Sequence, residues 1–188
     1  MRERLRHARR QLDESTQHEA AQAIAGRLAP RLDLLRPSVV AAYLATDGEI
    51  SPSIAVEALR LSDVRTAFPR IEADVMTFHV VESDEQLVQG RWGLSEPPPE
   101  TPAIDPTELD VILVPLVGFD TKLDRLGRGK AYYDRALAFF GATPRPSAPV
   151  LIGLAHDLQL VAAIDARAHD IALDAVITPT KIYGLLPS

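Results

Sequence analysis

The feature that most constrains the fold is the apolar run "LDVILVPLVGFD" at residues 109–120, which leads into the charged, glycine-broken stretch "RLGRGKAYYDRAL" at residues 125–137. An aliphatic, β-branched run of this kind is typical of a strand buried on both faces. The aromatic and apolar residues that follow predict a helix over 131–141 that ends at Gly141. A glycine-rich segment between a buried strand and a helix indicates an α/β sheet with a ligand-binding loop at its edge.

The rest of the chain shows the same alternation of strand and helix patterns. The order strand, helix, strand predicts a mostly parallel central sheet in a three-layer α/β/α arrangement. A chain of 188 residues, 46% of them hydrophobic, can bury one sizeable core, so we expect one domain over residues 1–188. The expected elements are helices over 2–35 with a break capped by Asp13 or Ser15, strand 37–45, helix 51–63, strands 64–71 and 75–81, a proline-rich surface excursion over 83–110, and strands 149–157 and 173–179.

Composition excludes several classes of protein. The absence of cysteine rules out disulfides, a thiolate nucleophile and cysteine-ligated metals. The segment "MRERLRHARRQLDE" is too charged for a signal peptide, and no run approaches the about 18 apolar residues of a membrane span. We therefore expect a cytoplasmic protein without a membrane partner, and we take it to be a monomer.

The charge distribution points to a small anionic ligand. A net charge of −6 argues against a broad nucleic-acid surface, so no nucleic-acid partner is expected. Basic residues nevertheless gather at two places, the N-terminus and the glycine-broken stretch. They are Arg2, Arg4, Arg6, Arg9 and Arg10, and Arg125, Arg128 and Lys130.

The glycine-broken stretch has the chemistry of an anion-binding loop. Gly127 and Gly129 allow the backbone to approach a ligand closely, and the three neighbouring cations can neutralise phosphate charge. The spacing matches neither a Walker P-loop nor a dinucleotide-binding fingerprint, which requires a third glycine. A solvated basic turn is the alternative that the local pattern leaves open.

The segment "VPLVGFDTKLDRLGRGKAYYDRAL" resembles the signature of the 5-formyltetrahydrofolate cyclo-ligase family, with its P-x-x-x-F-D and R-L-G-x-G-x-G-Y-Y-D pattern. Further segments are similar to the family's patterns in the same order along nearly the whole chain. They are "YLATDGEIS", "FPRI" with "MTF", "GRWGLSEP", "IGLAHDLQLV" and "AHDIALDAVITP".

This resemblance implies an ATP-dependent ring closure. The substrate would be 5-formyltetrahydrofolate, with or without a polyglutamate tail, and the products 5,10-methenyltetrahydrofolate, ADP and phosphate, with Mg²⁺ required. Transfer of the γ-phosphoryl group to the formyl oxygen would create a leaving group that the neighbouring anilino nitrogen displaces. Positioning and charge neutralisation would then supply most of the catalysis, without a protein nucleophile.

The resemblance also implies roles for individual residues in binding ATP. Arg128, Lys130 and Tyr132 are the expected catalytic residues, the first two because they can stabilise charge on the transferring phosphoryl group. Arg2 and Arg6 loosely match a Lys-x-x-Leu-Arg pattern that contacts ATP, although a solvated basic helix face explains them equally well. The residues expected to wrap the phosphates are Arg125, Leu126, Gly127, Arg128, Gly129, Lys130, Ala131, Tyr132 and Tyr133.

Other residues are expected to bind folate and metal. Glu49 matches a glutamate that accepts hydrogen bonds from the pterin edge, with Leu44 beside it. Arg128, Tyr132 and Trp92 would also contact folate, although Trp92 could equally be a hydrophobic plug. Asp134 and Asp170 match the family's magnesium carboxylates, which suits the preference of Mg²⁺ for one or two carboxylates with water and phosphate oxygens. For His156 and His169, structural or polar roles are favoured over a metal site.

Two departures from the family pattern bear on activity. Ala131 stands where the family usually has glycine, in a loop that could require a positive φ. Arg2 replaces lysine, which changes a point charge into a planar fork. Two alternatives remain open. One is a sugar-phosphate enzyme, because strand-loop-helix phosphate sites occur on related three-layer sheets. The other is a non-catalytic protein that stores formylfolate, or that binds nucleotide through a loop disabled by Ala131.

Overall fold

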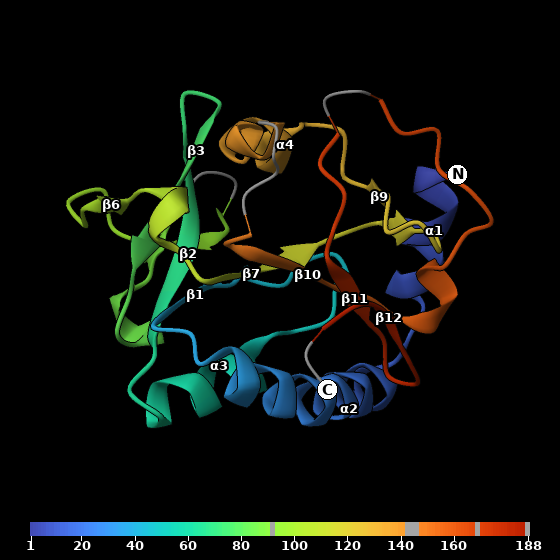
Figure 1. The fold of residues 1–188 in the computed structure, drawn as a ribbon, viewed down its shortest axis with the longest axis horizontal. Helices are drawn as coiled ribbons and strands as arrows, with labels where there is room; N and C mark the ends of the chain where they lie inside the picture. Colours follow the sequence, from blue (N-terminus) through green and yellow to red (C-terminus); the bar gives the residue numbers. More distant parts are fainter. Residues whose placement is uncertain (91–92, 142–146, 168–169, 187–188) are drawn as a thin grey trace.

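The computed structural model describes residues 1–90, 93–141, 147–167 and 170–186. In this part of the chain, the central sheet has eight strands in the order β12-β11-β10-β7-β1-β2-β3-β6 (Figure 1). The five strands from β11 to β2 are mutually parallel, and the three at the two edges are antiparallel to their neighbours. The strands are β1 (Val39–Ala41), β2 (Arg65–Glu72), β3 (Val75–Val80), β6 (Ala103–Ile104), β7 (Val111–Pro115), β10 (Val150–Leu154), β11 (Ala175–Ile177) and β12 (Ile182–Gly184).

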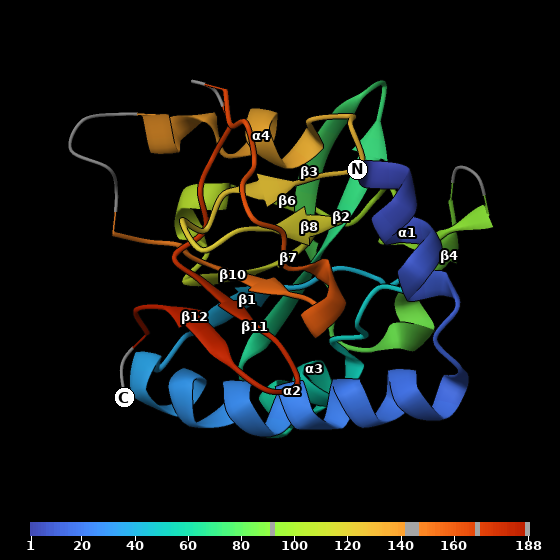
Figure 2. The same ribbon diagram turned by 90° about the vertical axis from the view of Figure 1, so that its right-hand side faces the viewer.

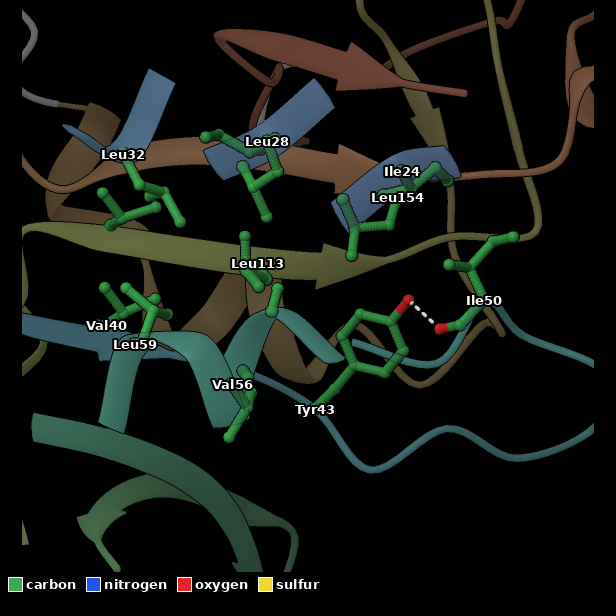
Figure 3. Close-up of a cluster of buried hydrophobic side chains, with 14 of the residues drawn as sticks. Ile24, Leu28, Leu32, Val40, Tyr43, Ile50, Val56, Leu59, Leu113 and Leu154 are labelled. Carbon is green, nitrogen blue, oxygen red and sulfur yellow. Dashed lines mark hydrogen bonds between the residues drawn. The ribbon is translucent and has the colours of Figure 1, made fainter. Parts of the chain in front are cut away.

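Helices α2 (Glu14–Leu35) and α3 (Ser53–Leu61) cover one face of the sheet, as Figures 1 and 2 show. Ile24, Leu28 and Leu32 project from α2 at helical spacing onto Val40 of β1 and Leu113 of β7 (Figure 3). The hydroxyl of Tyr43 in this cluster donates to the carbonyl of Ile50 at 2.6 Å, so the loop after β1 is fastened to the core.

The opposite face is covered by the short helix α4 (Tyr132–Ala136), the 3₁₀ turn η4 (Ala138–Gly141) and irregular segments (Figure 2). Alternate residues of each central strand face this second core. In β7, for example, Ile112 and Val114 point here, whereas Val111 and Leu113 point to the α2 side. Because both faces are buried, the central strands read as continuous apolar runs.

The structure confirms the expected mostly parallel α/β sheet and refines its elements. The expected break in the N-terminal helix separates α1 (Arg2–Arg10) from α2, where the Asp13 side chain accepts from the Thr16 amide at 2.8 Å. The proline-rich excursion is a connection that contains short elements and adds β6 to the sheet edge. These are η1 (Asp84–Gln86), β4 (Val88–Gln89), β5 (Ser95–Glu96), β6 and η3 (Pro106–Glu108).

The sequence had suggested that the glycine-broken stretch follows β7 directly, and the structure shows that it does not. A small hairpin of β8 (Gly118–Phe119) and β9 (Arg125–Leu126) intervenes, so the stretch begins as a strand. Its turn is held by Asp120, which is buried and accepts from the amides of Lys122 and Asp124 at 2.9 and 3.2 Å. The expected helix over 131–141 is shorter, because α4 passes into η4 after Ala136.

The carboxyl ends of β1, β7 and β10 lie at one edge of the sheet, because these strands are parallel. The segments that follow them are residues 42–52, the β8–β9 hairpin with its glycine loop, and η5 (Asp157–Gln159). Ligands of open α/β sheets bind at this edge. No helix in the described ranges has the combination of length and apolarity needed to cross a bilayer.

Candidate active site

The turn after β1 carries two carboxylates that face basic residues. Thr46 to Glu49 form a tight turn in which Asp47 and Gly48 both have positive φ, 58° and 72°. The Glu49 amide donates to the Thr46 carbonyl at 3.1 Å, and a Glu49 carboxylate oxygen accepts from the Thr46 amide at 3.1 Å. Glu49 is 9% exposed, so the turn presents a largely buried carboxylate at the edge of the sheet.

Arg128 of the glycine loop reaches this turn. Its Nη2 lies 3.0 Å from Glu49 Oε1 and donates to both the Thr46 carbonyl and the Thr46 hydroxyl. Its Nε also donates to Glu49 Oε1 at 3.1 Å. The structure thus brings together the residue expected to bind the pterin and a residue expected to contact phosphate and formyl groups.

Helix α1 covers the same turn with arginines. Arg6 Nε lies 2.8 Å from Asp47 Oδ2, and Arg9 Nη2 lies 2.9 Å from the same oxygen. Arg2 Nε donates to the Gly127 carbonyl at 2.7 Å, so the N-terminal helix also contacts the glycine loop. Of the two N-terminal residues expected at the ATP site, Arg2 therefore contacts the glycine loop, and Arg6 contacts the turn after β1.

Arg9 and Asp47 were not singled out as site residues from the sequence. Arg2, Arg6 and Arg9 are four and three residues apart, a spacing that places them on one helix face. That spacing was the signal that could have identified Arg9. Asp47 stands beside the turn-forming Gly48, and its carboxylate gave no signal beyond that of a turn residue.

The glycine loop exposes its central cation. Gly129 has φ 97° and Ala131 has φ 51°, both in the left-handed region. The Ala131 position therefore has the positive φ that made this departure from glycine notable. Lys130 is exposed, and its carbonyl accepts from Arg135 at 2.8 Å, which fixes the loop backbone while the ammonium faces solvent.

The two tyrosines after Ala131 point to different places. The Tyr132 hydroxyl donates to Asp74 at 3.2 Å on the turn between β2 and β3, and Arg135 lies over its ring. The Tyr133 hydroxyl is buried with no hydrogen-bond partner among the described residues. Burial raises the pKa of Tyr133, and the nearby Glu49 carboxylate raises it further, so the phenol is neutral beneath the site.

The two proposed magnesium carboxylates lie on neighbouring segments. Asp134 forms an ion pair with Arg125 and accepts from the Ile171 amide at 3.3 Å. Asp170, adjacent to Ile171, accepts from the Arg167 amide at 2.7 Å. The described residues contain no group of three or more metal-ligating side chains, but two neighbouring carboxylates fit an ion that also binds phosphate oxygens and water.

The pKa values of the two turn carboxylates shift in opposite directions. Burial raises the pKa of Glu49, and the charges of Arg128 and Arg9 oppose that rise without cancelling it. Burial also acts to raise the pKa of Asp47, but hydrogen bonds from Arg6 and Arg9 outweigh it, so its pKa lies below the ordinary value. Asp47 is therefore a firmly ionised anchor, whereas Glu49 depends on its arginines to remain charged.

The remaining candidates occupy varied positions. Leu44 is half-buried in the segment after β1 and lines a small cavity with Tyr43 and Phe68. Leu126 is paired with Gly118 in the β8–β9 hairpin. Trp92 and His169 lie outside the described residues. His156 is buried, and its ring lies near the Gly48 backbone of the same turn, which suits a structural role.

Comparison with known proteins identifies the family. The sequence model of the 5-formyltetrahydrofolate cyclo-ligase family matches residues 1–179. The chain belongs to the 5-formyltetrahydrofolate cyclo-ligase family. The 5-formyltetrahydrofolate cyclo-ligase of Escherichia coli (strain K12) is 33% identical over 186 residues, which cover 95% of this chain and 98% of that one.

Solved structures of this cyclo-ligase family agree in fold. The structure of Aquifex aeolicus 5,10-methenyltetrahydrofolate synthetase matches with a TM-score of 0.83 and 26% identity, over 100% of this chain and 92% of that chain. A 5,10-methenyltetrahydrofolate synthetase from Mycoplasma pneumoniae matches with a TM-score of 0.75 and 25% identity, over 95% and 96% of the two chains. The family expected from the sequence is confirmed, and the protein is an enzyme of the cyclo-ligase class.

Proposed function

We propose that the chain converts 5-formyltetrahydrofolate to 5,10-methenyltetrahydrofolate in an ATP- and Mg²⁺-dependent reaction that releases ADP and phosphate. The observation that carries the proposal is the contact between Arg128 and Glu49, 3.0 Å apart, which joins the glycine loop to the turn after β1. A ligand held by both segments would have its polar edge at Glu49 and its reacting group near the cations of the loop.

The chemistry follows from the substrate. The oxygen of an N-formyl group is a poor leaving group. The γ-phosphoryl group of ATP is therefore transferred to this oxygen, and ADP is released. The anilino nitrogen then attacks the activated carbon, and the C–O bond breaks as phosphate departs. In this scheme Arg128 and the exposed Lys130 neutralise charge on the transferring group, and Glu49 holds the pterin edge.

Asp134 and Asp170 are the residues that would hold the magnesium ion. When bound with the nucleotide, the ion would neutralise phosphate charge. Arg125 and the Ile171 amide both contact Oδ1 of Asp134, so Oδ2 is the oxygen that would bind the ion. Tyr132 is the first residue of α4 and directly follows the glycine loop, which supports its proposed contact with the substrates.

The test is an absorbance assay. The methenyl product absorbs in the near ultraviolet where the formyl substrate does not, and we expect its formation to require ATP and Mg²⁺ and to match ADP release one to one. Binding of formylfolate without turnover would instead favour a storage protein. Product formation without ATP would contradict the proposed activation of the formyl oxygen.

A variant at Lys130 tests the role of the loop. We expect Lys130→Ala to lower kcat by about 10²–10³-fold, as loss of one charge-stabilising donor does in other enzymes, with an unfolding midpoint close to that of the wild type. Lys181→Ala is the matched control, since Lys181 is also exposed but precedes β12. Equal kcat values for the two variants would remove Lys130 from the catalytic group.

A further inference from the structure

Arg9 is a fully buried arginine in a helix that is otherwise largely exposed. Its side chain is 0% exposed, whereas those of Arg6 and Arg10 on the same helix are 30% and 40% exposed. Burial of a guanidinium is expensive unless every part of it is paired. Its position therefore calls for a structural explanation that a solvated basic helix face does not provide.

The contacts of Arg9 use the full width of the guanidinium fork. Nε donates to the Asp47 carbonyl at 2.8 Å, and Nη2 donates to Asp47 Oδ2 at 2.9 Å. Nη1 donates to the carbonyl of Leu116, directly after β7, at 2.9 Å. One side chain thus joins the turn after β1 to the segment after β7.

The turn is packed against α1 at the same residue. A Cβ atom on Gly48 would come within 2.9 Å of the Arg9 carbonyl oxygen, so the backbone of the turn lies directly against the last turn of α1. The Glu49 carboxylate follows directly, with its Oε1 3.5 Å from Arg9 Nη2. The position and direction of Glu49 are therefore set by a turn that Arg9 contacts with both its side chain, at Asp47, and its backbone, at Gly48.

Arg9 and Arg128 share Glu49 but differ in freedom. The Arg128 side chain is 39% exposed and belongs to the glycine loop, so it can turn toward a phosphate group. Arg9 is enclosed and has no such alternative. When Arg128 leaves Glu49, Arg9 remains the cation beside this carboxylate.

We propose that Arg9 is a positioning residue for folate binding, which holds the Asp47–Gly48 turn and stays beside Glu49 when Arg128 turns to phosphate. The inference rests on the proposed function, in which Glu49 accepts hydrogen bonds from the pterin edge. It assigns Arg9 no contact with either substrate. Arg6 pairs with the same aspartate but has no contact with Leu116 or Glu49 among the described residues, so the role belongs to Arg9.

The experiment compares Arg9→Lys with Arg27→Lys. Lysine keeps the charge but cannot reach the Asp47 and Leu116 carbonyls together, because its ammonium is a single point on a flexible stem. Arg27 donates to the Pro179 carbonyl at 2.8 Å and ties α2 to the segment after β11, away from the turn. It is therefore a matched control for loss of an arginine that spans two segments.

Steady-state kinetics and amide hydrogen exchange supply the two measurements. We expect Arg9→Lys to raise KM for 5-formyltetrahydrofolate about tenfold, the usual effect of losing a charge-assisted hydrogen bond. KM for ATP and kcat should stay within about threefold of the wild type, since the pterin contact holds ground and transition states equally. Amides of residues 46–49 should exchange faster in the ligand-free variant, and Arg27→Lys should show neither effect.

Other outcomes have defined meanings. Unchanged KM for formylfolate in Arg9→Lys, or an equal rise in both KM values with the same loss of stability as Arg27→Lys, would overturn the positioning role. A wild-type protein that forms no methenyl product would instead refute the proposed function. In that case, unchanged exchange at 46–49 in Arg9→Lys would still refute the grip on the turn, and faster exchange would support it.

Discussion

Ala131 is a residue whose side chain does not suit its backbone conformation. It occupies the left-handed region, with φ 51° and ψ 29°, at the point where the glycine loop enters α4. For a residue with a Cβ atom this conformation costs about 1–2 kcal/mol, which glycine avoids. The chain therefore keeps the loop conformation expected for glycine and accepts the strain of alanine.

We predict that Ala131→Gly stabilises the protein by up to about 1 kcal/mol, because relief of strain exceeds the added entropy of the unfolded chain. Urea unfolding measures the change. Ala58→Gly is the control, since Ala58 is exposed within α3 and its replacement should cost about 0.5–1 kcal/mol. Similar destabilisation by both substitutions would show that Ala131 is not strained.

At the scale of elements, the packing of the central strands limits the size of the side chain that residue 153 can carry. Gly153 lies in β10, which runs between β7 and β11. A Cβ atom there would lie 2.6 Å from Leu173 Cδ1 and 2.7 Å from Leu116 Cδ2, in a core with no room for either to move freely. The glycine therefore leaves room for the Leu116 and Leu173 side chains to pack against β10.

Gly153→Ala should therefore destabilise the protein by about 1–3 kcal/mol through overpacking. Gly26→Ala is a matched control, because nothing lies within 4 Å of the Cβ position at Gly26 in α2. That substitution should stabilise by about 0.5–1 kcal/mol, the usual gain of alanine over glycine within a helix. Unfolding midpoints in urea that move in the same direction would disprove the packing argument.

The elements show why sequence reasoning succeeded for some parts of the molecule and not for others. The apolar runs of β1, β7 and β10 predict buried parallel strands because both faces must be apolar. The edge strands β6 and β12 have two and three residues and were missed, since so short a segment carries no detectable period. The β8–β9 hairpin was missed because its turn depends on the buried Asp120, a tertiary contact.

The candidate site follows the same division. Family resemblance supplied Glu49 and the glycine loop, and their contact through Arg128 depends on the parallel order of β1 and β7. Helical spacing could have placed Arg9 on the face of Arg2 and Arg6, but its burial required the structure, because only its three hydrogen bonds to Asp47 and Leu116 account for it. Local pattern indicates which residues have suitable chemistry, and long-range contacts decide which of them meet.

At the scale of the whole molecule, buried ionisable groups beside the candidate site also affect the stability of the fold. The turn after β1 lies between α1 and the segment after β10, where His156 is 4% exposed and lies near the Gly48 backbone. Its Nε2 is buried without a hydrogen-bond partner among the described residues. A proton added to this ring would place a second positive charge near Arg9, which has no exposure to solvent.

This arrangement predicts how stability depends on pH. Burial, with a smaller effect from Arg9, lowers the pKa of His156 below its ordinary value of 6.5, against opposing effects of Gly48 and Asp157. The unfolded chain then binds the proton more tightly than the folded chain, so the contribution of His156 to stability is complete above pH 6.5. It is lost as the pH falls from 6.5 through the lowered pKa, at a rate of up to about 1.4 kcal/mol per pH unit.

We expect the stability difference between the wild type and His156→Gln, measured by urea unfolding, to shift in favour of the variant between pH 7.5 and 5. Taking the difference cancels the titration of all other groups that the substitution does not perturb. His18→Gln is the substitution control, since His18 is exposed on α2, and comparing the two variants isolates the effect of the buried ring. A pH-independent difference for His156→Gln would mean that the folded protein accepts the proton at His156 as readily as the unfolded chain does, and the packing of the turn would then be looser than the contacts of Gly48 and Arg9 imply.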